Sequence, residues 1–312
     1  MRTLFINIKE LIQVENLPKK FVAGKEMKML PTLKNAFLLI ENDLISDFGH
    51  MENMPKTKID RIIDVTDKLI LPTWCDSHSH IVYAGNRSQE FVDRINGLTY
   101  EEIAKKGGGI LNSAKLLQNT SEEDLYIDSA IRLEEVMQLG TGAIEIKSGY
   151  GLTKDAELKM LRVIQKLKKN YPIAIKATFL GAHALPTEYK NRKNEYLKEV
   201  IDTILPQVTK EKLADFIDIF CETGYSSVED TEQLLKAGEE NGLKAKIHVN
   251  QFNAIGGIQA GVKHKALSVD HLEEMRDEDI DVLKSTKTMP VALPSCSTFL
   301  IAFASISVRP WP

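Results

Sequence analysis

The sequence predicts an α/β fold, a (β/α) barrel of the TIM type that follows a smaller β-rich segment. From about Lys68 onward, short apolar runs alternate with helical segments, which is the pattern of a parallel sheet. Because so many of these units follow in series, a barrel is favoured over an open sheet. The 312 residues accommodate one barrel of roughly 250 residues and a smaller appendage. We expect the N-terminal segment at residues 1–70 and the barrel at residues 71–312.

The composition is that of an ordinary globular protein, with 40 Lys and Arg against 44 Asp and Glu and 43% hydrophobic residues. A nucleic-acid partner would require a clustered basic surplus, which a net charge of −4 does not offer. The N-terminus has no apolar signal-peptide core, and the apolar run at residues 299–308 is shorter than the ~20 residues of a membrane helix. Cys75, Cys221 and Cys296 are too far apart for a metal knuckle or a disulfide framework. We therefore expect a cytoplasmic protein that binds neither nucleic acid nor membrane.

The individual strands and helices follow from apolar periodicity and from capping residues. In the N-terminal segment, strands are expected at residues 3–8, 36–41, 44–48 and 61–65, with a hairpin at Asn42–Asp43. Helices are expected from the cap at Ser121 to Gly140 and at residues 154–169, 227–241 and 273–284. The predicted barrel strands are residues 69–74, 141–146, 173–180, 216–220, 244–249, 267–269 and 289–293. That makes seven, whereas a closed barrel has eight.

Residues 81–140 form a long insertion between the first two predicted barrel strands. It contains Gly107, Gly108 and Gly109, but no Gly-Lys-Ser/Thr follows, so this is not a phosphate-binding loop. We interpret the triple glycine as a flexible turn that allows close approach of the backbone.

Five of the seven histidines lie at or just after the end of a predicted barrel strand: His78, His80, His183, His248 and His271. This end of a barrel is where active sites lie. In extended backbone, residues two apart point the same way, so His78 and His80 can bind one ion together with His248. An HxH motif alone is also compatible with two solvated loop histidines. Imidazole ligands suit Zn or Fe, and we expect His50 and His264 to be surface residues.

Two further residues are candidates for holding a substrate. Arg87 follows the HxH motif and could clamp a carboxylate, or it could form a surface ion pair with Glu90 or Asp93. Tyr150 lies between Gly149 and Gly151 after the second strand, where it could point inward or serve as a turn tyrosine.

Six segments together resemble the imidazolonepropionase family of the amidohydrolase superfamily. They are LPTWCDSHSHIVYAGNR, GGGIL, EIKSGYGL, FLGAHALP, KIHVNQF and SVDHLEE, in order from about Leu71 to Ser297. GGGIL and EIKSGYG are typical of this family in particular. The resemblance implies one divalent metal ion, Zn or Fe, and hydrolysis of 4-imidazolone-5-propanoate to N-formimidoyl-L-glutamate in histidine degradation. It also implies that the N-terminal segment is half of a small β-sandwich and that the chain forms a homodimer.

The resemblance also assigns roles to individual residues. His78, His80 and His248 match metal ligands, and His271 matches a catalytic histidine that polarises the ring carbonyl. The residues that match substrate contacts are Arg87, Tyr150, His183 and Gln251. Many relatives have a glutamate where this chain has Gln251, which can donate and accept hydrogen bonds but cannot act as a base.

The sequence departs from the family pattern at residues 298–312. The family has an eighth strand ending in an aspartate, which ligates the metal and takes a proton from the attacking water, followed by an Asn-Pro-Gly loop. Residues 298–312 (TFLIAFASISVRPWP) do not resemble this region and contain no Asp or Glu. We therefore expect a truncated chain. Because it lacks the general base, its rate of hydrolysis should be about 10²–10⁴-fold lower than that of a family member with the aspartate. The alternatives are an inactive truncated product of this family and another amidohydrolase, such as a deaminase that acts on a cyclic nitrogen heterocycle.

Overall fold

The computed structural model describes residues 1–15, 17, 19, 21–98, 102 and 108–301. Gly107 of the triple glycine and residues 302–312 of the non-matching tail lie outside the described residues. The chain divides into two compact units, Met1–Trp74 and Cys75–Pro312. Each unit is described by itself.

The first unit is a five-stranded sheet in the order β3-β2-β1-β4, with β5 also paired to β1. Its strands are β1 (Arg2–Ile12), β2 (Thr32–Glu41), β3 (Leu44–His50), β4 (Arg61–Asp64) and β5 (Leu69–Ile70). The predicted hairpin is confirmed: β2 and β3 pair antiparallel across Asn42 and Asp43. Both turn residues have positive φ, 50° and 68°, a conformation that Asn and Asp tolerate in two-residue hairpin turns.

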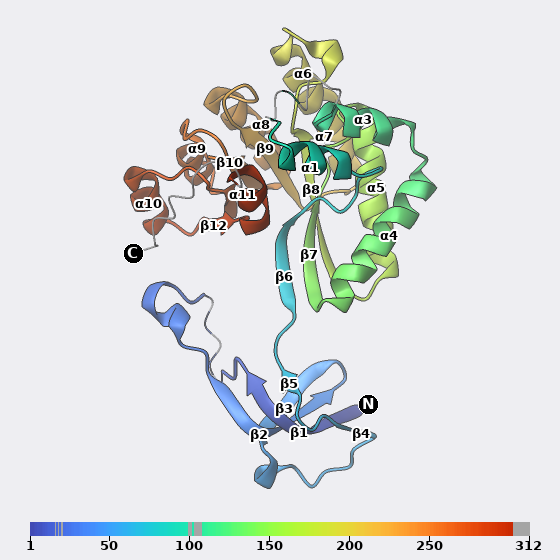
Figure 1. Ribbon diagram of the computed structural model, residues 1–312, viewed down its shortest axis with the longest axis vertical. Coiled ribbons are helices and arrows are strands. Elements are labelled where there is room, and N and C mark those ends of the chain that lie inside the picture. The colour runs from blue at the N-terminus through green and yellow to red at the C-terminus, as the bar shows by residue number, and fades with distance from the viewer. Residues whose placement is uncertain (16, 18, 20, 99–101, 103–107, 302–312) are drawn as a thin grey trace. The chain divides into compact units, whose positions relative to one another are not determined.

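The second unit is a seven-stranded sheet in the order β12-β11-β10-β9-β8-β7-β6, and the strand registers from β7 to β12 are all parallel (Figure 1). Spatial order follows chain order because helices return the chain between successive strands. The strands are β6 (Trp74–Ser79), β7 (Thr141–Lys147), β8 (Ala174–Ala182), β9 (Phe216–Cys221), β10 (Lys244–Val249), β11 (Ser268–His271) and β12 (Met289–Ala292). The predicted barrel with seven strands is confirmed for the described part of the chain.

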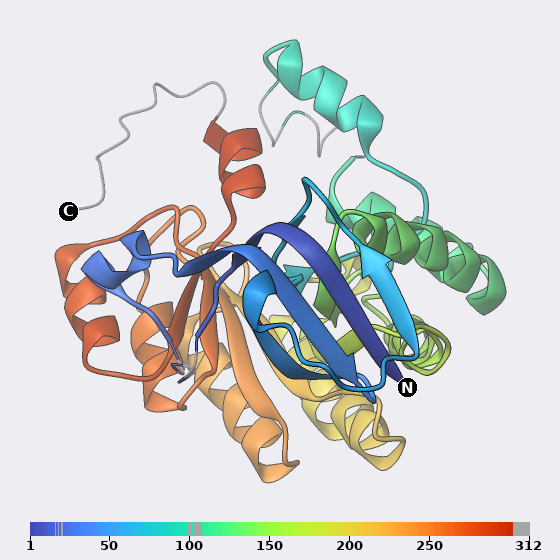
Figure 2. The same cartoon turned by 90° about the horizontal axis from the view of Figure 1, so that it is seen from below.

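The helices of this unit are α1 (Ser88–Ile95), α3 (Ile110–Asn119), α4 (Glu122–Gln138), α5 (Lys154–Asn170), α6 (Lys193–Glu199), α7 (Leu205–Lys210), α8 (Val228–Glu240), α9 (Gly257–Lys263), α10 (Asp277–Lys284) and α11 (Pro294–Ile301). Of these, α4, α5, α8 and α9 pack against the outer face of the sheet (Figures 1 and 2). Their apolar sides and the strands form one core, in which residues such as Ile146, Phe179 and Ile247 are fully buried. Ser121 caps α4 by accepting from the Asp124 backbone N–H, as its sequence predicts. Within the described residues, no helix combines the length and the apolar character that a membrane crossing requires.

Two boundary predictions are wrong. The first barrel strand is Trp74–Ser79 instead of residues 69–74, and Leu69–Ile70 instead pairs with β1 in the first unit. The sequence WCDSHS lacks the apolar pattern that predicts a strand, because Asp76 and His78 line the pocket and do not pack in the apolar core. The helix expected from residue 273 begins at Asp277, because His271 and Leu272 have positive φ of 93° and 67° and turn the chain first.

Candidate active site

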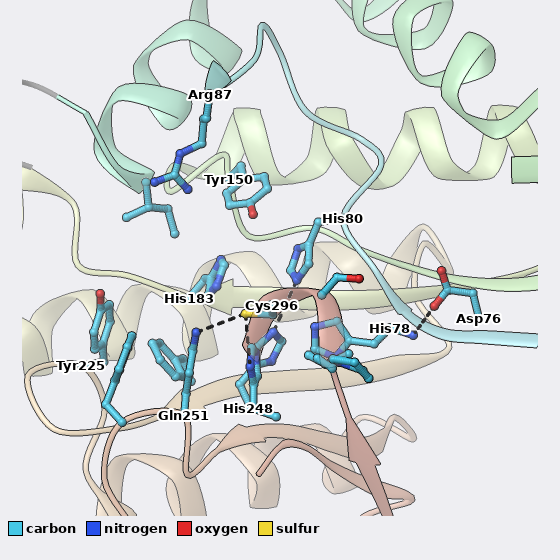
Figure 3. Close-up of a pocket in the computed structure, with 17 residues that line it drawn as sticks. Asp76, His78, His80, Arg87, Tyr150, His183, Tyr225, His248, Gln251 and Cys296 are labelled. Atoms are coloured by element: carbon cyan, nitrogen blue, oxygen red, sulfur yellow. Dashed lines mark hydrogen bonds between the residues drawn. The ribbon is translucent and has the colours of Figure 1, made fainter. Parts of the chain in front are cut away.

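A cavity of about 530 Å³ lies at the carboxyl ends of the strands of the second unit (Figure 3). It is lined by all eight site residues that the sequence predicts: His78, His80, Arg87, Tyr150, His183, His248, Gln251 and His271. The strands explain this convergence, since β6, β8, β10 and β11 deliver the five histidines at or next to their carboxyl ends. His50 is exposed, as expected, whereas His264 is only partly exposed.

The histidines form a compact cluster. Nε2 of His80 lies 3.4 Å from Nε2 of His248. Ligand atoms of His78, His248 and His271 all lie within 4.8 Å of one another. Two nitrogens bound at 2.0–2.1 Å to one tetrahedral ion are separated by roughly 3.4 Å, so the His80–His248 spacing fits a shared ion.

A carboxylate lies behind two of these rings. Nδ1 of His78 lies 2.7 Å from Oδ2 of Asp270, and Nδ1 of His248 lies 2.9 Å from Oδ2 of Asp218. The second contact is close but lacks the alignment of a hydrogen bond. Asp218 is held in turn by the backbone N–H groups of His248 and Ile219, which donate to its Oδ1. Carboxylates that hold Nδ1 leave Nε2 for a metal ion, which is the usual arrangement around metal-binding histidines.

Burial favours the neutral form of four of the pocket histidines by lowering their pKa values. It lowers the pKa of His78 and His80 well below the usual value, and neighbouring cationic groups add to this effect. The pKa of His183 and of His248 falls to about 3, again mainly through burial. A neutral imidazole is the form that binds a metal ion. The donor type, the spacing and the charge state therefore all fit a divalent ion that accepts nitrogen ligands, such as Zn or Fe.

A group of buried charged side chains lies in the interior of the barrel, beneath the histidines. Lys147 is fully buried, with Nζ 2.8 Å from Glu145 Oε1, 2.8 Å from Asp218 Oδ2 and 3.6 Å from Asp270 Oδ2. Burial acts to lower the pKa of Lys147, but Asp218 and Glu145 outweigh it and raise the pKa. The pKa of Asp218 lies well below its usual value, because His248 and Lys147 outweigh the opposing effect of burial. Lys147 therefore bears a positive charge.

Arg87 lies on the side of the pocket away from His248, and Tyr150 lies between Arg87 and His80 (Figure 3). Arg87 both lines the pocket and pairs with Glu90, whose Oε2 lies 2.7 Å from Nε. The expected ion pair with Glu90 is therefore confirmed, whereas the clamp on a substrate carboxylate stays a prediction. Oε1 of Glu90 accepts the backbone N–H of Gly109 at 2.9 Å, so the pair also anchors the end of the triple glycine.

The loop that carries Tyr150 is held by a buried glutamate that sequence reasoning missed. Glu157 accepts from the backbone N–H groups of Gly149 (3.0 Å), Gly151 (2.7 Å) and Leu152 (2.9 Å). Gly149 has φ of 107°, and a Cβ there would meet Leu180 and His183 at 3.0–3.1 Å. The Tyr150 ring centroid lies 5.3 Å from that of His80.

Other pocket residues were also not predicted. Asp76 accepts the backbone N–H of His78 at 3.1 Å, and Phe220 and Tyr225 form an aromatic wall with centroids 4.4 Å apart. Gln251 donates to Sγ of Cys296, which lies 3.9 Å from Nδ1 of His271. The sequence did carry a signal for the charged residues beneath the pocket, since Glu145, Lys147 and Asp218 lie inside otherwise apolar strands and must find buried partners.

No family profile matches the chain. The chain is 68% identical to the imidazolonepropionase of Christiangramia forsetii, over 96% of this chain and 73% of that protein. It is 38% identical to the imidazolonepropionase of Clostridium tetani, over 93% of this chain and 69% of that protein. Among solved structures, a triazine hydrolase from Arthobacter aurescens matches with a TM-score of 0.66 and 13% identity, over 96% of this chain and 66% of that one. A guanine deaminase from C. acetobutylicum matches with a TM-score of 0.63 and 15% identity, over 96% of this chain and 69% of that one. These structural likenesses concern the fold alone.

Proposed function

The chain belongs to the imidazolonepropionase family, and we propose that its pocket hydrolyses the ring of 4-imidazolone-5-propanoate to give N-formimidoyl-L-glutamate in histidine degradation. The observation that carries this proposal is the high identity to curated imidazolonepropionases over 96% of the chain. The pocket supports it, because a nitrogen-rich cluster and an arginine line the same cavity.

In the proposed site, His78, His80 and His248 hold one divalent ion, Zn or Fe. When bound, such an ion lowers the pKa of water to about 7 and so supplies hydroxide at neutral pH. The 3.4 Å between the Nε2 atoms of His80 and His248 supports the shared ligand set. Asp270 is hydrogen-bonded to Nδ1 of His78, and Asp218 lies 2.9 Å from Nδ1 of His248, so the Nε2 atoms of both rings are the ones left for the ion.

Arg87 binds the propanoate carboxylate and so fixes the ring against the attacking water. Its pairing with Glu90 orients the guanidinium before substrate arrives. Nδ1 of His183 lies 3.2 Å from the carbonyl oxygen of Gly149, which can only accept a hydrogen bond. The proton of this neutral ring is therefore on Nδ1, and Nε2 is left to accept an N–H from the substrate ring. Tyr150 and Gln251 supply further polar contacts.

His271 is proposed to be the catalytic histidine that donates to the ring carbonyl oxygen. Hydrolysis places negative charge on that oxygen, and a fixed donor facing it stabilises the transition state. Glu273 Oε2 lies 3.5 Å from Nδ1 of His271, close enough for its negative charge to favour the ring's protonated, donating form. Loss of one such donor typically lowers the rate by about 10²–10³-fold.

The remaining assignments are that the protein is cytoplasmic and homodimeric, and that its partner is a small molecule rather than nucleic acid or membrane. The cytoplasmic location follows from the sequence composition, and the homodimer follows from the family resemblance. Size-exclusion chromatography with light scattering tests the dimer, because a mass near 35 kDa in place of twice that value would contradict it.

A substrate panel tests the reaction. The purified, metal-loaded chain is incubated with 4-imidazolone-5-propanoate and, separately, with guanine and cytosine, and the products are identified by mass spectrometry. Formation of N-formimidoyl-L-glutamate without ammonia is expected. Release of ammonia from a nucleobase would favour a deaminase instead. A cooperatively folded, metal-loaded chain without turnover would favour an inactive member of the family.

A further inference from the structure

The five charged residues beneath the histidine cluster form a network that one lysine joins. Nζ of Lys147 contacts Asp218 at 2.8 Å and Asp270 at 3.6 Å, and these are the two carboxylates that lie behind His248 and His78. Lys147, Asp218 and Asp270 have side chains with no exposed surface. The mechanism proposed above assigns no step to this lysine.

The second lysine of the network, Lys246, has a different set of contacts. Its Nζ lies 3.3 Å from Glu145, 3.7 Å from Asp270 and 2.7 Å from the carbonyl oxygen of Ser77. Among the described contacts, Lys147 is the cation that reaches both carboxylates behind the histidines. It thus links two ligand-bearing strands, β10 and β6, through residues of β9 and β11.

The charges explain why a cation is needed at this position. Three carboxylates, those of Glu145, Asp218 and Asp270, are buried together with two ammonium groups. Without Lys147, three anions would share one cation in a region that water cannot reach, and a buried charge without a partner is strongly unfavourable. The carboxylates would then turn toward other donors, and the imidazole rings that they hold would turn with them.

We propose that Lys147 is a positioning residue that fixes Asp218 and Asp270 behind His248 and His78 and thereby sets the affinity of the pocket for its metal ion. The inference rests on the proposed function, because it takes His78 and His248 as ligands. Residues that orient metal-binding histidines typically change metal affinity by roughly 10- to 100-fold when replaced. Lys147 acts on two histidines at once, so an effect in this range is expected from one substitution.

The test compares Lys147→Met with Lys159→Met in the full 312-residue chain. Methionine keeps the length and apolar stem of lysine but removes its charge and its donors. Lys159 is a suitable control because its Nζ donates to the carbonyl oxygens of Leu117 (2.7 Å) and Thr120 (2.6 Å) and makes no described contact with the network. Zn²⁺ affinity is measured by competition with a chromophoric chelator, and the visible absorption of the Co²⁺-loaded protein reports the ligand geometry.

We expect Lys147→Met to lower Zn²⁺ affinity by 10- to 100-fold and to change the Co²⁺ spectrum, while Lys159→Met leaves both unchanged. Equal affinity and an equal spectrum in Lys147→Met and the wild type would overturn the proposal, as would equal losses in both variants. If the wild type itself binds no ion, the proposed metal site fails as well, so the two failures are distinguishable.

A second variant covers the case in which Lys147→Met does not fold. The double substitution Lys147→Met with Glu145→Gln removes one cation and one anion together, which keeps the net charge of the network. It leaves Asp218 and Asp270 in place without their shared donor. A folded double variant with wild-type Zn²⁺ affinity would overturn the proposal, and a 10- to 100-fold loss would support it.

Discussion

His78 and Asp270 are 192 residues apart in the sequence, yet Nδ1 of the histidine lies 2.7 Å from Oδ2 of the aspartate. The contact joins β6, the first strand of the barrel sheet, to β11, the sixth. The side chains are 5% and 0% exposed, so water does not compete for it. A candidate metal ligand is thus oriented by a residue from the far side of the sheet.

Replacing Asp270 tests this orientation directly. We expect Asp270→Ala to lower Zn²⁺ affinity by roughly 10- to 100-fold, because the His78 ring loses the acceptor that fixes its Nδ1. Isothermal titration of the metal-free protein measures the change. Asp281→Ala, at an exposed position, is the control. Unchanged affinity in Asp270→Ala would mean that His78 is held by other contacts or is not a ligand.

Arg87 is expected to act on substrate binding more than on the chemical step. Arg87→Met should raise KM by about 10- to 100-fold, because a charge-assisted hydrogen bond contributes about 1.5–3 kcal/mol. Steady-state kinetics provides the measurement, with Arg192→Met as the control, since Arg192 pairs with Glu195 at the surface. A substrate analogue without the carboxylate should be processed equally by wild type and Arg87→Met. A variant that loses kcat at constant KM would refute this role.

Glu157 is expected to stabilise the fold through the Tyr150 loop. Glu157→Ala leaves the N–H groups of Gly149, Gly151 and Leu152 without their acceptor, and each buried unsatisfied group costs about 1–3 kcal/mol. We expect a loss of about 3 kcal/mol or more in the free energy of unfolding, measured by urea denaturation, together with a higher KM. Unchanged stability with wild-type KM would show that the loop holds its shape without this glutamate.

The metal-free protein should lose stability as the pH falls from 7.5 to 5.5. The pKa values of His78, His80, His183 and His248 are lowered in the folded state, those of His183 and His248 to about 3. In the unfolded chain these rings take up protons near pH 6.5, so unfolding binds protons and stability decreases with acidification. Each histidine contributes about 1 kcal/mol by pH 5.5.

Urea unfolding at several pH values measures this dependence. His183→Gln should reduce the loss of stability between pH 7.5 and 5.5 by the contribution of one histidine, since glutamine does not titrate. Stability that is flat between pH 7.5 and 5.5 would contradict the buried neutral cluster. As the pH falls, Glu145 and Glu157, whose pKa values burial raises, act in the opposite direction, because the folded protein takes up these protons before the unfolded chain does.

The sequence was sufficient for the fold class and for eight of the residues that line the pocket. Strands such as Lys244–Val249 are short apolar runs between helices, and in a parallel barrel their carboxyl ends must converge. The polar strand β6 was misplaced because two of its side chains, those of Asp76 and His78, line the pocket, so the strand lacks the apolar pattern that usually marks one. The helices from Lys193 to Lys210 were missed, since a π-helical turn at Val200–Ile204 interrupts the ordinary period.

The supporting contacts of the pocket could not be predicted, because they depend on pairs of residues far apart in the chain. Asp270 is adjacent to a histidine that the sequence singled out, but its partner His78 is known only once β6 and β11 are placed. Lys147 is part of a recognised segment, yet its contact with Asp218 spans 71 residues. Local patterns specify elements, whereas these contacts come from the closure of the sheet. The roles of the individual site residues remain predictions.

We propose that this pocket hydrolyses 4-imidazolone-5-propanoate with a metal ion held by His78, His80 and His248. The most direct measurement is turnover of this substrate by the chelator-treated chain before and after one equivalent of Zn²⁺ or Fe²⁺, alongside His80→Ala. The account predicts no turnover without metal, N-formimidoyl-L-glutamate after reloading, and little recovery in His80→Ala. Full turnover by the metal-free chain, or equal recovery in His80→Ala, would contradict it.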